Sequence, residues 1–433
     1  MSQYRAYPAY KDSGVEWIGQ VPEHWKVARI KRLASLRNER RNDVSTDTIY
    51  IGLEDVEAGS GQYKPTNGSS RQSEDSTVGI FYEGDVLYGK LRPYLRKAIV
   101  SEMAGCCSTE FLVLMAEKTE PRWLQEWLLT PDVTHQIESG CEGAKMPRAD
   151  WWHIGSIEVV YPDQPERAQI LTTLDRETAR IDALIEKKTR FIELLKEKRQ
   201  ALITHAVTKG LDPNVKMKDS GVEWIGQVPE AWLNRKVFHA FQAIGSGTTP
   251  PSKEHEWYQG GTIPWITTSE LRENTVVKTK KCVTSDAMQK FSALKIFPAG
   301  SLAIAMYGAT IGRLGFLGIP ATTNQACCVL SGERDLNIQF LFYWLMAFRA
   351  DIVAFFSEGG GQPNINQEVI ASLRVPSPAP DEQATIAATL DRETARIDTL
   401  IGKAEQSITL LKERRAAFIT AAVTGQIDLR GKQ

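Results

Sequence analysis

The chain has 433 residues, of which 42% are hydrophobic and 24% are charged, and its formal net charge at pH 7 is −1. This length exceeds that of a single hydrophobic core, so two or more domains are expected. No apolar run approaches the ~20 residues of a membrane span, and no secretory signal opens the chain, so we expect a cytoplasmic protein without membrane contact. The near-zero charge excludes a uniformly basic surface and leaves nucleic-acid binding to local basic patches.

The chain is a tandem repeat. The segment Lys11–Trp25 returns as Lys218–Trp232 at an offset of 207 residues, with one position changed. The segment Leu174–Ile185 returns as Leu390–Ile401 at an offset of 216 residues, again with one position changed. The second half therefore carries nine extra residues between these two landmarks.

The nine extra residues are predicted to lie in one loop. Phe81 and Phe297 already match at the offset of 216, so the insertion precedes them. The stretch Gly245–Gly261 is rich in glycine and proline, which indicates a long loop and makes it the expected place.

Each half is predicted to hold a globular domain of mixed α/β type, in the α+β sense. Short apolar runs between Gly and Pro turns predict strands at 49–53, 85–88, 98–100 and 111–115. Helical periodicity predicts helices at 122–129 and 339–346. The tryptophans that the repeat keeps identical are expected to be packing anchors of these domains, namely Trp17, Trp25, Trp224 and Trp232.

A long helix is predicted after each domain. Asp163 is the expected N-cap of the first helix, with Glu166 three residues on. Apolar residues at alternating spacings of four and three form a heptad seam in each helix. The seam residues are Leu174, Ile181, Ile185, Ile192, Leu195 and Leu202 in the first helix and Leu390, Ile397, Ile401, Ile408, Leu411 and Phe418 in the second, and the polar Arg199 and Arg415 also lie on it.

The repeat predicts how the helices pack and how the chain divides. If a pseudo-two-fold axis relates the halves, the two helices run antiparallel and bury each other's seams. The first helix has 43 residues from Glu166 to Thr208, or ~65 Å, enough to hold two recognition domains more than one DNA turn (~34 Å) apart. We expect globular domains at 1–162 and 213–377 and helical regions at 163–212 and 378–433.

No metal site or disulfide is expected. The six cysteines have no Cys-x-x-Cys spacing, and the six histidines have no metal-ligand spacing. Cys106 and Cys107 are adjacent in apolar surroundings, as are Cys327 and Cys328. These pairs predict buried free thiols.

No catalytic centre is expected either. The sequence lacks the phosphate-binding pattern Gly-x4-Gly-Lys-Ser/Thr and the dinucleotide-binding pattern Gly-x-Gly-x-x-Gly after a strand. One nuclease-like pattern matches formally, because Pro162-Asp163 precedes Glu186 and Lys188. Glu186 is replaced by Gly402 in the second half, and a solvated face of the long helix explains the pattern better.

Two basic segments of the first half are candidate DNA contacts. Their cations could bind phosphates or reach guanine edges. The first segment, Arg29–Arg41, fits an amphipathic helix with a solvated face equally well, and the second, Tyr88–Lys97, could be a basic hairpin without a partner. The candidate residues are Arg37, Arg40 and Arg41 in the first segment and Lys90, Arg92, Tyr94, Arg96 and Lys97 in the second.

The second half keeps the frame of these segments but changes the side chains. Only the last cation of the second segment is kept, as Lys97 against Arg313. A further candidate pair is 145–148 against 361–367, where asparagine and glutamine suit adenine edges and arginine suits guanine, although turn chemistry is an equal alternative. The added candidates are Lys145 and Arg148 in the first half and Tyr307, Thr310, Arg313, Gln362, Asn364 and Asn366 in the second.

The chain resembles the specificity subunits of type I restriction-modification systems. The resemblance rests on Lys11–Trp25 and its repeat, on Gly89–Lys97, on Gly361–Gln367, and on the Leu-Asp-Arg-Glu-Thr-Ala-Arg-Ile-Asp helices that end in Ala-Val-Thr. It implies two target recognition domains that read the halves of a split site in double-stranded DNA, with helical spacers between them. It also implies two modification subunits that bind S-adenosylmethionine and methylate adenine, and restriction subunits that use ATP and Mg²⁺.

By this resemblance the chain itself binds no cofactor and catalyses nothing. We therefore expect the DNA recognition subunit of a type I complex, with an asymmetric bipartite target. The alternative is a stand-alone DNA-binding or scaffold protein whose long helices form only an intramolecular rod. A nuclease that uses Glu186 and Lys188 is a distant third hypothesis.

Overall fold

The computed structural model describes residues 4–45, 47–66, 76–141, 143, 145–252, 254–357 and 364–430. The chain divides into two compact units. Unit 1 comprises residues 1–189 and 405–433, and unit 2 comprises residues 190–404. Each long helix therefore contributes to both units. The domain boundaries expected at 162, 212 and 377 separate the helices from the globular domains, which is a different division of the chain, and they stay a prediction.

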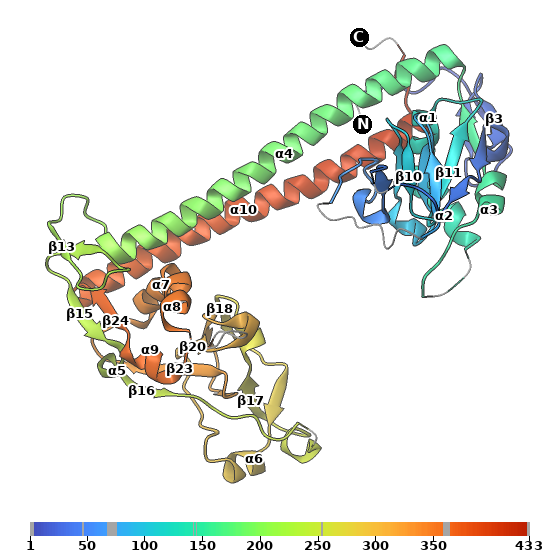
Figure 1. Ribbon diagram of the computed structural model, residues 1–433. Helices are drawn as coiled ribbons and strands as arrows, with labels where there is room; N and C mark the ends of the chain where they lie inside the picture. The colour runs from blue at the N-terminus through green and yellow to red at the C-terminus, as the bar shows by residue number, and fades with distance from the viewer. Residues whose placement is uncertain are drawn as a thin grey trace. The chain divides into compact units, whose positions relative to one another are not determined.

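Unit 1 is a mixed α/β fold on a pair of helix segments (Figure 1). Its strands are β1 (Tyr10–Asp12), β2 (Gln20–Pro22), β3 (Lys26–Arg29), β4 (Ala34–Arg37), β5 (Arg40–Arg41), β6 (Tyr50–Ile51), β7 (Val78–Phe81), β8 (Val86–Gly89), β9 (Ala98–Val100), β10 (Gly105–Cys107), β11 (Phe111–Ala116) and β12 (Glu158–Tyr161). Its shorter helices are η1 (Ile30–Arg32), η2 (Leu53–Asp55), η3 (Pro93–Leu95), α1 (Pro121–Leu129), α2 (Pro131–Ser139) and α3 (Trp151–Ser156). The sheets have the orders β4-β11-β8-β9 and β5-β7-β10-β6, with two further strand pairs, β1-β2 and β12-β3.

Unit 2 repeats this plan. Its strands are β13 (Met217–Asp219), β14 (Gln227–Pro229), β15 (Leu233–Lys236), β16 (Phe241–Gly245), β17 (Ile263–Ile266), β18 (Asn274–Val276), β19 (Lys281–Val283), β20 (Leu302–Ala305), β21 (Leu314–Leu317), β22 (Thr322–Thr323), β23 (Cys327–Glu333) and β24 (Arg374–Ser377). Its shorter helices are α5 (Val237–Ala240), η4 (His255–Trp257), η5 (Thr268–Glu270), α6 (Ser285–Lys290), η6 (Gly308–Thr310), α7 (Ile338–Ala347), α8 (Arg349–Phe356) and α9 (Gln367–Ser372). Sheet β16-β23-β20-β21-β18 is the larger one, and β8 and its counterpart β20 are buried at every position because neighbours flank them on both sides.

The mixed α/β fold class is confirmed, and the strands and helices expected from the sequence lie within a few residues of the observed ones. The helical alternative for Arg29–Arg41 is wrong. This stretch forms β3, the short turn η1, β4 and β5. Its residues are extended because β3 pairs with β12 and β4 pairs with β11, so sheet pairing rather than helical amphipathicity determines the local structure.

The strand registers locate the nine extra residues of the second half. Equivalent strands are offset by 207 residues at β3 and β15, by 208 at β4 and β16, by 215 at β6 and β17, and by 216 from β8 and β20 onward. Seven extra residues therefore fall between β16 and β17, in the predicted loop. The expectation of one insertion is corrected, because one residue is added between β15 and β16 and another after β17. Single additions in turns leave no compositional signature.

The repeated tryptophans anchor the cores, as predicted. Trp25 and Trp232 are fully buried, and Trp17 and Trp224 are half-buried against the same cores. Trp25 also donates a hydrogen bond from Nε1 to Glu166 Oε1 at 3.3 Å. Each core includes the end of one long helix and the start of the other, so the globular part of each unit depends on both helices.

The long helices are α4 (Gln164–Lys209) and α10 (Pro380–Val423). Asp163 caps α4, because its Oδ1 accepts a hydrogen bond from the Glu166 backbone N–H at 3.1 Å. The predicted seam residues all lie inward to some degree. Those buried are Leu174, Ile181, Ile192, Leu195, Leu390, Ile397 and Phe418, and those half-buried are Ile185, Leu202, Ile401, Ile408 and Leu411.

The two helices pack antiparallel in each unit. In unit 1 the Arg415 guanidinium pairs with Asp182 at 3.1 Å, and in unit 2 Arg199 pairs with Asp398 at 3.0 Å. The offset of 216 residues converts one pair into the other, as a pseudo-two-fold relation requires. Both arginines occupy the seam, where a polar residue fixes the register between helices.

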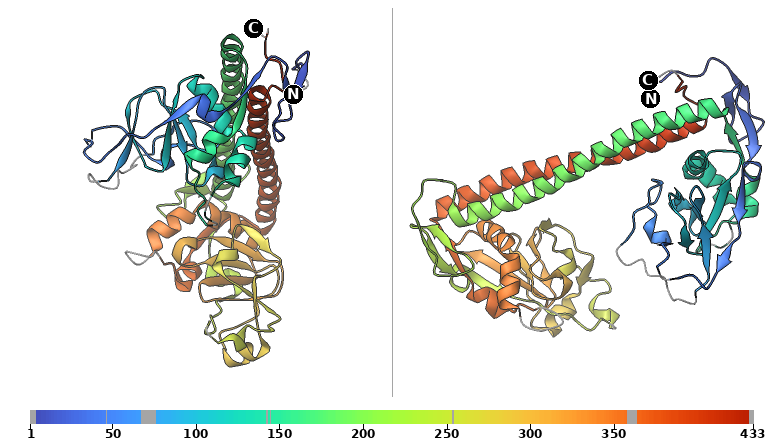
Figure 2. Two further views of the ribbon diagram at one scale, coloured as in Figure 1. Left: turned by 90° about the vertical axis from the view of Figure 1, so that its right-hand side faces the viewer. Right: turned by 45° about the horizontal axis from the view of Figure 1, so that its top comes forward.

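The two ends of the chain meet in unit 1 (Figure 2). Arg5 and Asp428 form an antiparallel bridge. The buried carboxylate of Glu166 accepts a hydrogen bond from the Tyr7 hydroxyl at 2.9 Å and lies 2.6 Å from His24 Nε2. The N-terminal segment, the start of α4 and the C-terminal tail therefore form one polar cluster.

Helix α7 lies in the apolar core of unit 2, and α8 adds Ile352 to it. Six residues of α7 are buried, including Phe340 and Trp344. Within the described residues, no single helix has both the length and the apolar character of a membrane span, and only α7 and α8 together pass that test, with a bend of 69° between them.

Candidate nucleic-acid interface

In unit 1 the fold brings two separate basic segments together. One is the loop after β8, which contains η3, and the other is the segment 145–148, which precedes α3. The Arg92 backbone N–H donates to Pro147 O at 2.9 Å, and the Ala149 N–H donates to Lys90 O at 2.9 Å. Leu91 and Arg148 form an isolated bridge between these hydrogen bonds. The two candidate segments therefore share one surface.

Unit 2 contains the same frame at the offset of 216. Tyr307 and Asn364 form the equivalent bridge, and the Ile365 N–H donates to Met306 O at 2.8 Å. The candidate Gln362 lies outside the described residues. The backbone that presents the candidate side chains is thus common to both units, whereas the side chains differ.

Several candidate side chains of unit 1 are exposed on this surface. Arg92, Lys145 and Arg148 are exposed cations. Tyr94, two residues after Arg92, is 49% exposed. Arg148 pairs with Glu110 at 2.8 Å, which orients its guanidinium. Met146, which is 53% exposed, was not predicted from the sequence. An apolar residue in a basic loop could have indicated it as a candidate contact. The surface therefore combines cations with apolar groups.

Other candidates of the same loop are engaged by the protein. Lys97 Nζ donates to Leu53 O at 2.5 Å, and Arg96 Nη1 donates to Leu129 O at 3.4 Å. Lys90 is half-buried, and this burial lowers the pKa of its ammonium group, with a smaller opposing effect of Glu110. Lys97 and Arg96 therefore hold the loop in place.

The candidates of the first basic segment divide in the same way. Arg37 donates two hydrogen bonds to Asp85, at 2.8 and 3.1 Å, and its guanidinium lies 4.6 Å from the ring centre of Tyr82. Arg41 pairs with Glu39 at 2.7 Å. Arg40 is exposed, and its charge contributes to the lowered pKa of Lys90, which places it near the loop after β8. Arg40 is therefore the member of this segment that joins the basic surface.

In unit 2 two neighbouring asparagines have different environments. Asn364 is exposed at the bridge. Asn366 caps α9, because its Oδ1 accepts from the Val369 N–H at 2.8 Å. Its counterpart Asp150 caps α3 through the His153 N–H at 3.0 Å. This geometry favours turn chemistry for Asn366.

The remaining candidates of unit 2 lie in the loop after β20. Tyr307 is half-buried, and burial raises the pKa of its hydroxyl. The Thr310 hydroxyl donates to Tyr307 O at 3.5 Å, and the Arg313 N–H donates to Thr310 O at 3.0 Å. The side chain of Arg313 is half-buried. This loop offers hydroxyl groups where its counterpart offers cations.

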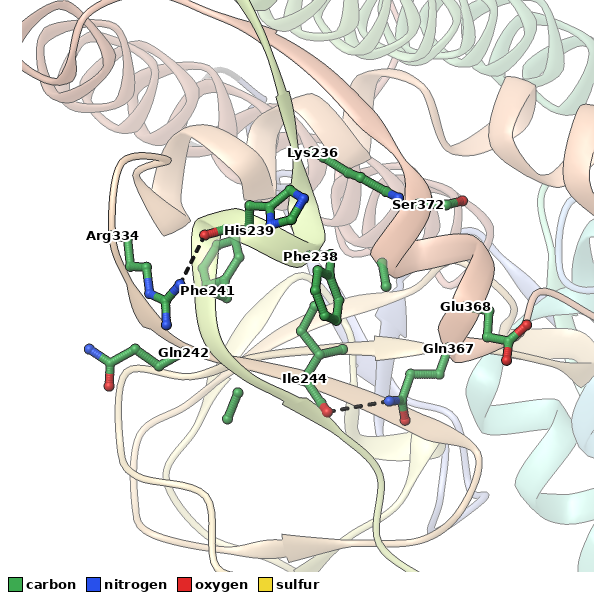
Figure 3. Close-up of a pocket in the computed structure, with 12 residues that line it drawn as sticks. Lys236, Phe238, His239, Phe241, Gln242, Ile244, Arg334, Gln367, Glu368 and Ser372 are labelled. Carbon is green, nitrogen blue, oxygen red and sulfur yellow. Dashed lines mark hydrogen bonds between the residues drawn. The ribbon is translucent and has the colours of Figure 1, made fainter.

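Unit 2 also contains a pocket of about 560 Å³ (Figure 3). It lies between the turn that holds α5 and helix α9, and Lys236, Phe238 and Arg334 are among its lining residues. The Gln367 side-chain amide donates to Ile244 O across the pocket at 3.3 Å. The amide of Gln367 therefore joins α9 to β16.

Cys106, Cys107, Cys327 and Cys328 are buried, as predicted, and no disulfide links the six cysteines. Burial raises the pKa of Cys107, Cys327 and Cys328 to about 12, so these thiols stay neutral and unreactive near pH 7. The structure also accounts for two residues of the nuclease-like pattern. Asp163 caps α4, and Glu186 is exposed on the charged side of that helix.

Comparison with known proteins agrees with this architecture. Residues 229–410 match the family described as type I restriction modification DNA specificity domain. The specificity subunit of the EcoR124I/EcoR124II restriction enzyme from Escherichia coli is 24% identical, over 64% of this chain and 60% of that protein. The putative MjaX specificity subunit from Methanocaldococcus jannaschii is 22% identical, over 95% of this chain and 96% of that protein. Several of these relatives are matched over only part of their length, such as 38% for the MjaIX specificity subunit.

Solved structures show the same fold. A chain from a study of complex assembly and conformational transition of the type I R-M system superposes with a TM-score of 0.75 at 17% identity, covering 94% of this chain and 99% of that chain. The HsdS subunit from Thermoanaerobacter tengcongensis gives a TM-score of 0.55 at 17% identity, covering 94% of this chain and 98% of that chain. The matched domain, the full-length relative and the shared fold all support a type I restriction-modification specificity subunit.

Proposed function

We propose that this chain is the DNA recognition subunit of a type I restriction-modification complex and that it binds an asymmetric bipartite site. The observation that carries the proposal is the pair of equivalent surfaces with unlike side chains. The bridge Leu91–Arg148 in unit 1 and the bridge Tyr307–Asn364 in unit 2 hold the same loops. Unit 1 presents cations and apolar groups, and unit 2 presents amides and hydroxyls. Such surfaces suit two different half-sites, because arginine favours guanine and asparagine favours adenine.

The long helices supply the second part of the proposal, which is the docking of partner subunits. Large apolar side chains that are exposed together on one face of a helix pair mark a candidate contact surface. The exposed fractions of five such side chains on α4 and α10 lie between 39% and 57%. These residues are Leu184, Phe191, Leu194, Leu400 and Leu410.

Within each unit, these residues lie on one side of the helix pair. Counted from the seam, they occupy heptad positions c and g, which face the same side in an antiparallel pair. The globular part of each unit packs against the opposite side of the helix pair, which carries positions b and e. Ile203 and Val207, at positions e and b, pack into the core of unit 2, and their counterparts Ile419 and Val423 pack into the core of unit 1. The c and g side around the exposed residues is therefore the face that the proposal assigns to a partner.

The exposed leucines form two equivalent pairs. Unit 1 contains Leu184 and Leu410, and unit 2 contains Leu400 and Leu194. The offset of 216 residues converts one pair into the other. Equivalent surfaces bind equivalent partners, so the proposal assigns one modification subunit to each leucine pair. Catalysis then belongs to these partners, which bind S-adenosylmethionine, and to restriction subunits that use ATP and Mg²⁺ in the cytoplasm.

The proposal is tested by purifying the chain with its partners and by mapping methylated adenines in the genome of its source. We expect the chain to draw down a methyltransferase subunit. We also expect one methylated motif with two unequal halves, which disappears when the gene is deleted. A chain that binds DNA but no methyltransferase would support the alternative of a stand-alone DNA-binding protein, and an unchanged methylation pattern would contradict the proposal.

A further inference from the structure

The loop after β8 contains two arginines in the left-handed backbone region. Arg92 has a φ of 54° and Arg96 has a φ of 49°. In the equivalent loop of unit 2, at the offset of 216, these positions are Gly308 with a φ of 75° and Gly312 with a φ of 72°. The frame therefore requires a positive φ at both positions, whichever residue occupies them.

Glycine is the residue that suits this requirement. A Cβ atom in the left-handed region lies too close to the neighbouring carbonyl oxygen, whereas glycine adopts this region freely. Unit 2 follows this rule and unit 1 does not. Backbone strain of this kind persists where the side chain has a function that the glycine could not supply.

The structure accounts for Arg96 but not for Arg92. Arg96 donates to Leu129 O, and its guanidinium lies against Gly59, so its side chain connects three parts of unit 1. Arg92 is exposed, and its guanidinium has no hydrogen-bond or ion-pair partner among the residues that the structure describes. At the matching Gly308, an added Cβ meets no atom within 4 Å. The side chain at this position therefore projects away from the protein.

The loop holds Arg92 in a defined position. Its backbone N–H donates to Pro147 O at 2.9 Å, and its carbonyl accepts from the Leu95 N–H at 2.9 Å. Pro93 follows it at the first position of η3, where the fixed φ of proline limits the loop further. A side chain that projects from a loop fixed in this way is preorganised for a directional contact.

We infer that Arg92 is a base-reading residue of unit 1 and that its guanidinium contacts a guanine edge in the major groove. This inference rests on the proposed function. A phosphate contact needs only a nearby positive charge, which Arg40, Lys145 and Arg148 supply from residues without a positive φ. A bidentate contact with guanine O6 and N7 needs one fixed position, which explains an arginine where glycine fits best. Unit 2 has Gly308 there and lacks this contact.

The test uses the full chain with its modification subunits and the variants Arg92→Gly and Arg92→Lys. Because Arg92→Gly removes the strain, we expect its Tm to stay within about 2 °C of the parent or to rise. Discrimination at one base pair of one half-site should fall about ten- to a hundredfold, measured as relative methylation of single-base variants of the site. The other half-site should be read as before. Arg92→Lys should lose the same discrimination, because lysine cannot form the bidentate contact.

Three outcomes contradict the inference. A lower Tm of Arg92→Gly would show a structural role. Unchanged discrimination at every base pair would show that Arg92 reads no base. Full discrimination by Arg92→Lys, with a uniform loss of affinity in Arg92→Gly and a reduced salt dependence, would assign a phosphate contact instead.

Two controls test the backbone strain and the proposed function separately from the role of Arg92. Gly308→Ala tests the strain, and its Tm should fall by about 2–4 °C because alanine cannot adopt the positive φ freely. An unchanged Tm would remove the argument from strain. If the parent complex methylates no bipartite motif, the proposed function itself has failed, whereas a bipartite motif that Arg92→Gly leaves intact contradicts only the inference.

Discussion

At the scale of single residues, side chains that look alike in the sequence have different roles in the structure. Asn364 and Asn366 are both amides in one short segment, and both suit an adenine edge. Their roles differ in the structure. The side chain of Asn366 is the N-cap of α9, whereas Asn364 forms the bridge with Tyr307 and its side chain is exposed. Arg37 and Arg40 differ in the same way, since Asp85 binds the first and the second is exposed.

The two asparagines give a matched pair of variants. Asn366→Ala removes an N-cap, so we expect the free energy of unfolding to fall by about 1 kcal/mol. Asn364→Ala changes an exposed side chain, so its stability should stay within about 0.5 kcal/mol of the parent. Urea unfolding and methylation of single-base variants measure the two properties. Asn364→Ala should weaken recognition of one half-site, and a loss of stability without any change in recognition would assign Asn364 to the fold.

At the scale of elements, α4 and α10 each have one apolar stripe that is buried and one that is exposed. The buried stripe is the heptad seam, which the sequence period predicts directly. The exposed stripe shares the heptad period at positions c and g but has few apolar members, such as Leu184 and Leu410, so the sequence pattern alone does not distinguish it from a solvated face. It becomes visible only when the burial of each side chain is known.

Charges placed on the exposed stripe should remove one partner at a time. The double variant Leu184→Glu and Leu410→Glu should reduce the number of bound modification subunits from two to one, because a buried unpaired carboxylate opposes docking. The double variant Leu194→Glu and Leu400→Glu should do the same at the other site. Native mass spectrometry of the purified complex measures the stoichiometry.

The matched control changes the opposite side of the same helices. Thr189 and Thr409 are exposed and lie at positions e and b. The double variant Thr189→Glu and Thr409→Glu should keep both partners bound. If this control loses a partner, or if both leucine variants keep two, the assignment of the docking surface is wrong.

At the scale of the whole molecule, the duplication explains features that neither half explains alone. Asp182 pairs with Arg415 in unit 1, and Asp398 pairs with Arg199 in unit 2. The same two residue types therefore fix the antiparallel register twice. The offset that relates these pairs also relates the interface bridges and the exposed leucines. The scaffold, the register and the proposed docking surface are therefore all duplicated, whereas the side chains proposed to read DNA are not.

If the helices determine the spacing of the half-sites, longer helices should lengthen the spacer of the site. Four residues inserted between Arg190 and Phe191, together with four between Gln406 and Ser407, add ~6 Å to each helix near the centre of the register. We expect the unmethylated spacer to grow by about two base pairs while both half-sites stay the same. Methylation-aware sequencing of cells that express the variant measures both.

A loop insertion is the control for this experiment. Four residues added after Asp212, outside both long helices, should leave the spacer unchanged. An unchanged spacer in the helix variant, with methylation retained, would show that the helices do not act as a ruler.

The sequence by itself determined the duplication, the fold class, the two long helices and their buried seam. These properties follow from periodicity and from the near-identity of repeated segments, which are local along the chain. It also indicated which loops differ between the halves, since Tyr88–Lys97 and its counterpart keep the frame and change the side chains. The N-cap at Asp163 could be predicted because a cap and its helix are adjacent in sequence.

Only the tertiary structure decided which candidate side chains are free. Lys97 and Arg96 bind backbone carbonyls of Leu53 and Leu129, which are distant in sequence, and no local pattern announces such partners. The positive φ of Arg92 is likewise imposed by the hydrogen bond to Pro147, a contact across more than fifty residues. Local patterns specify elements, whereas long-range hydrogen bonds and burial decide whether a cation serves the fold or remains available to a ligand.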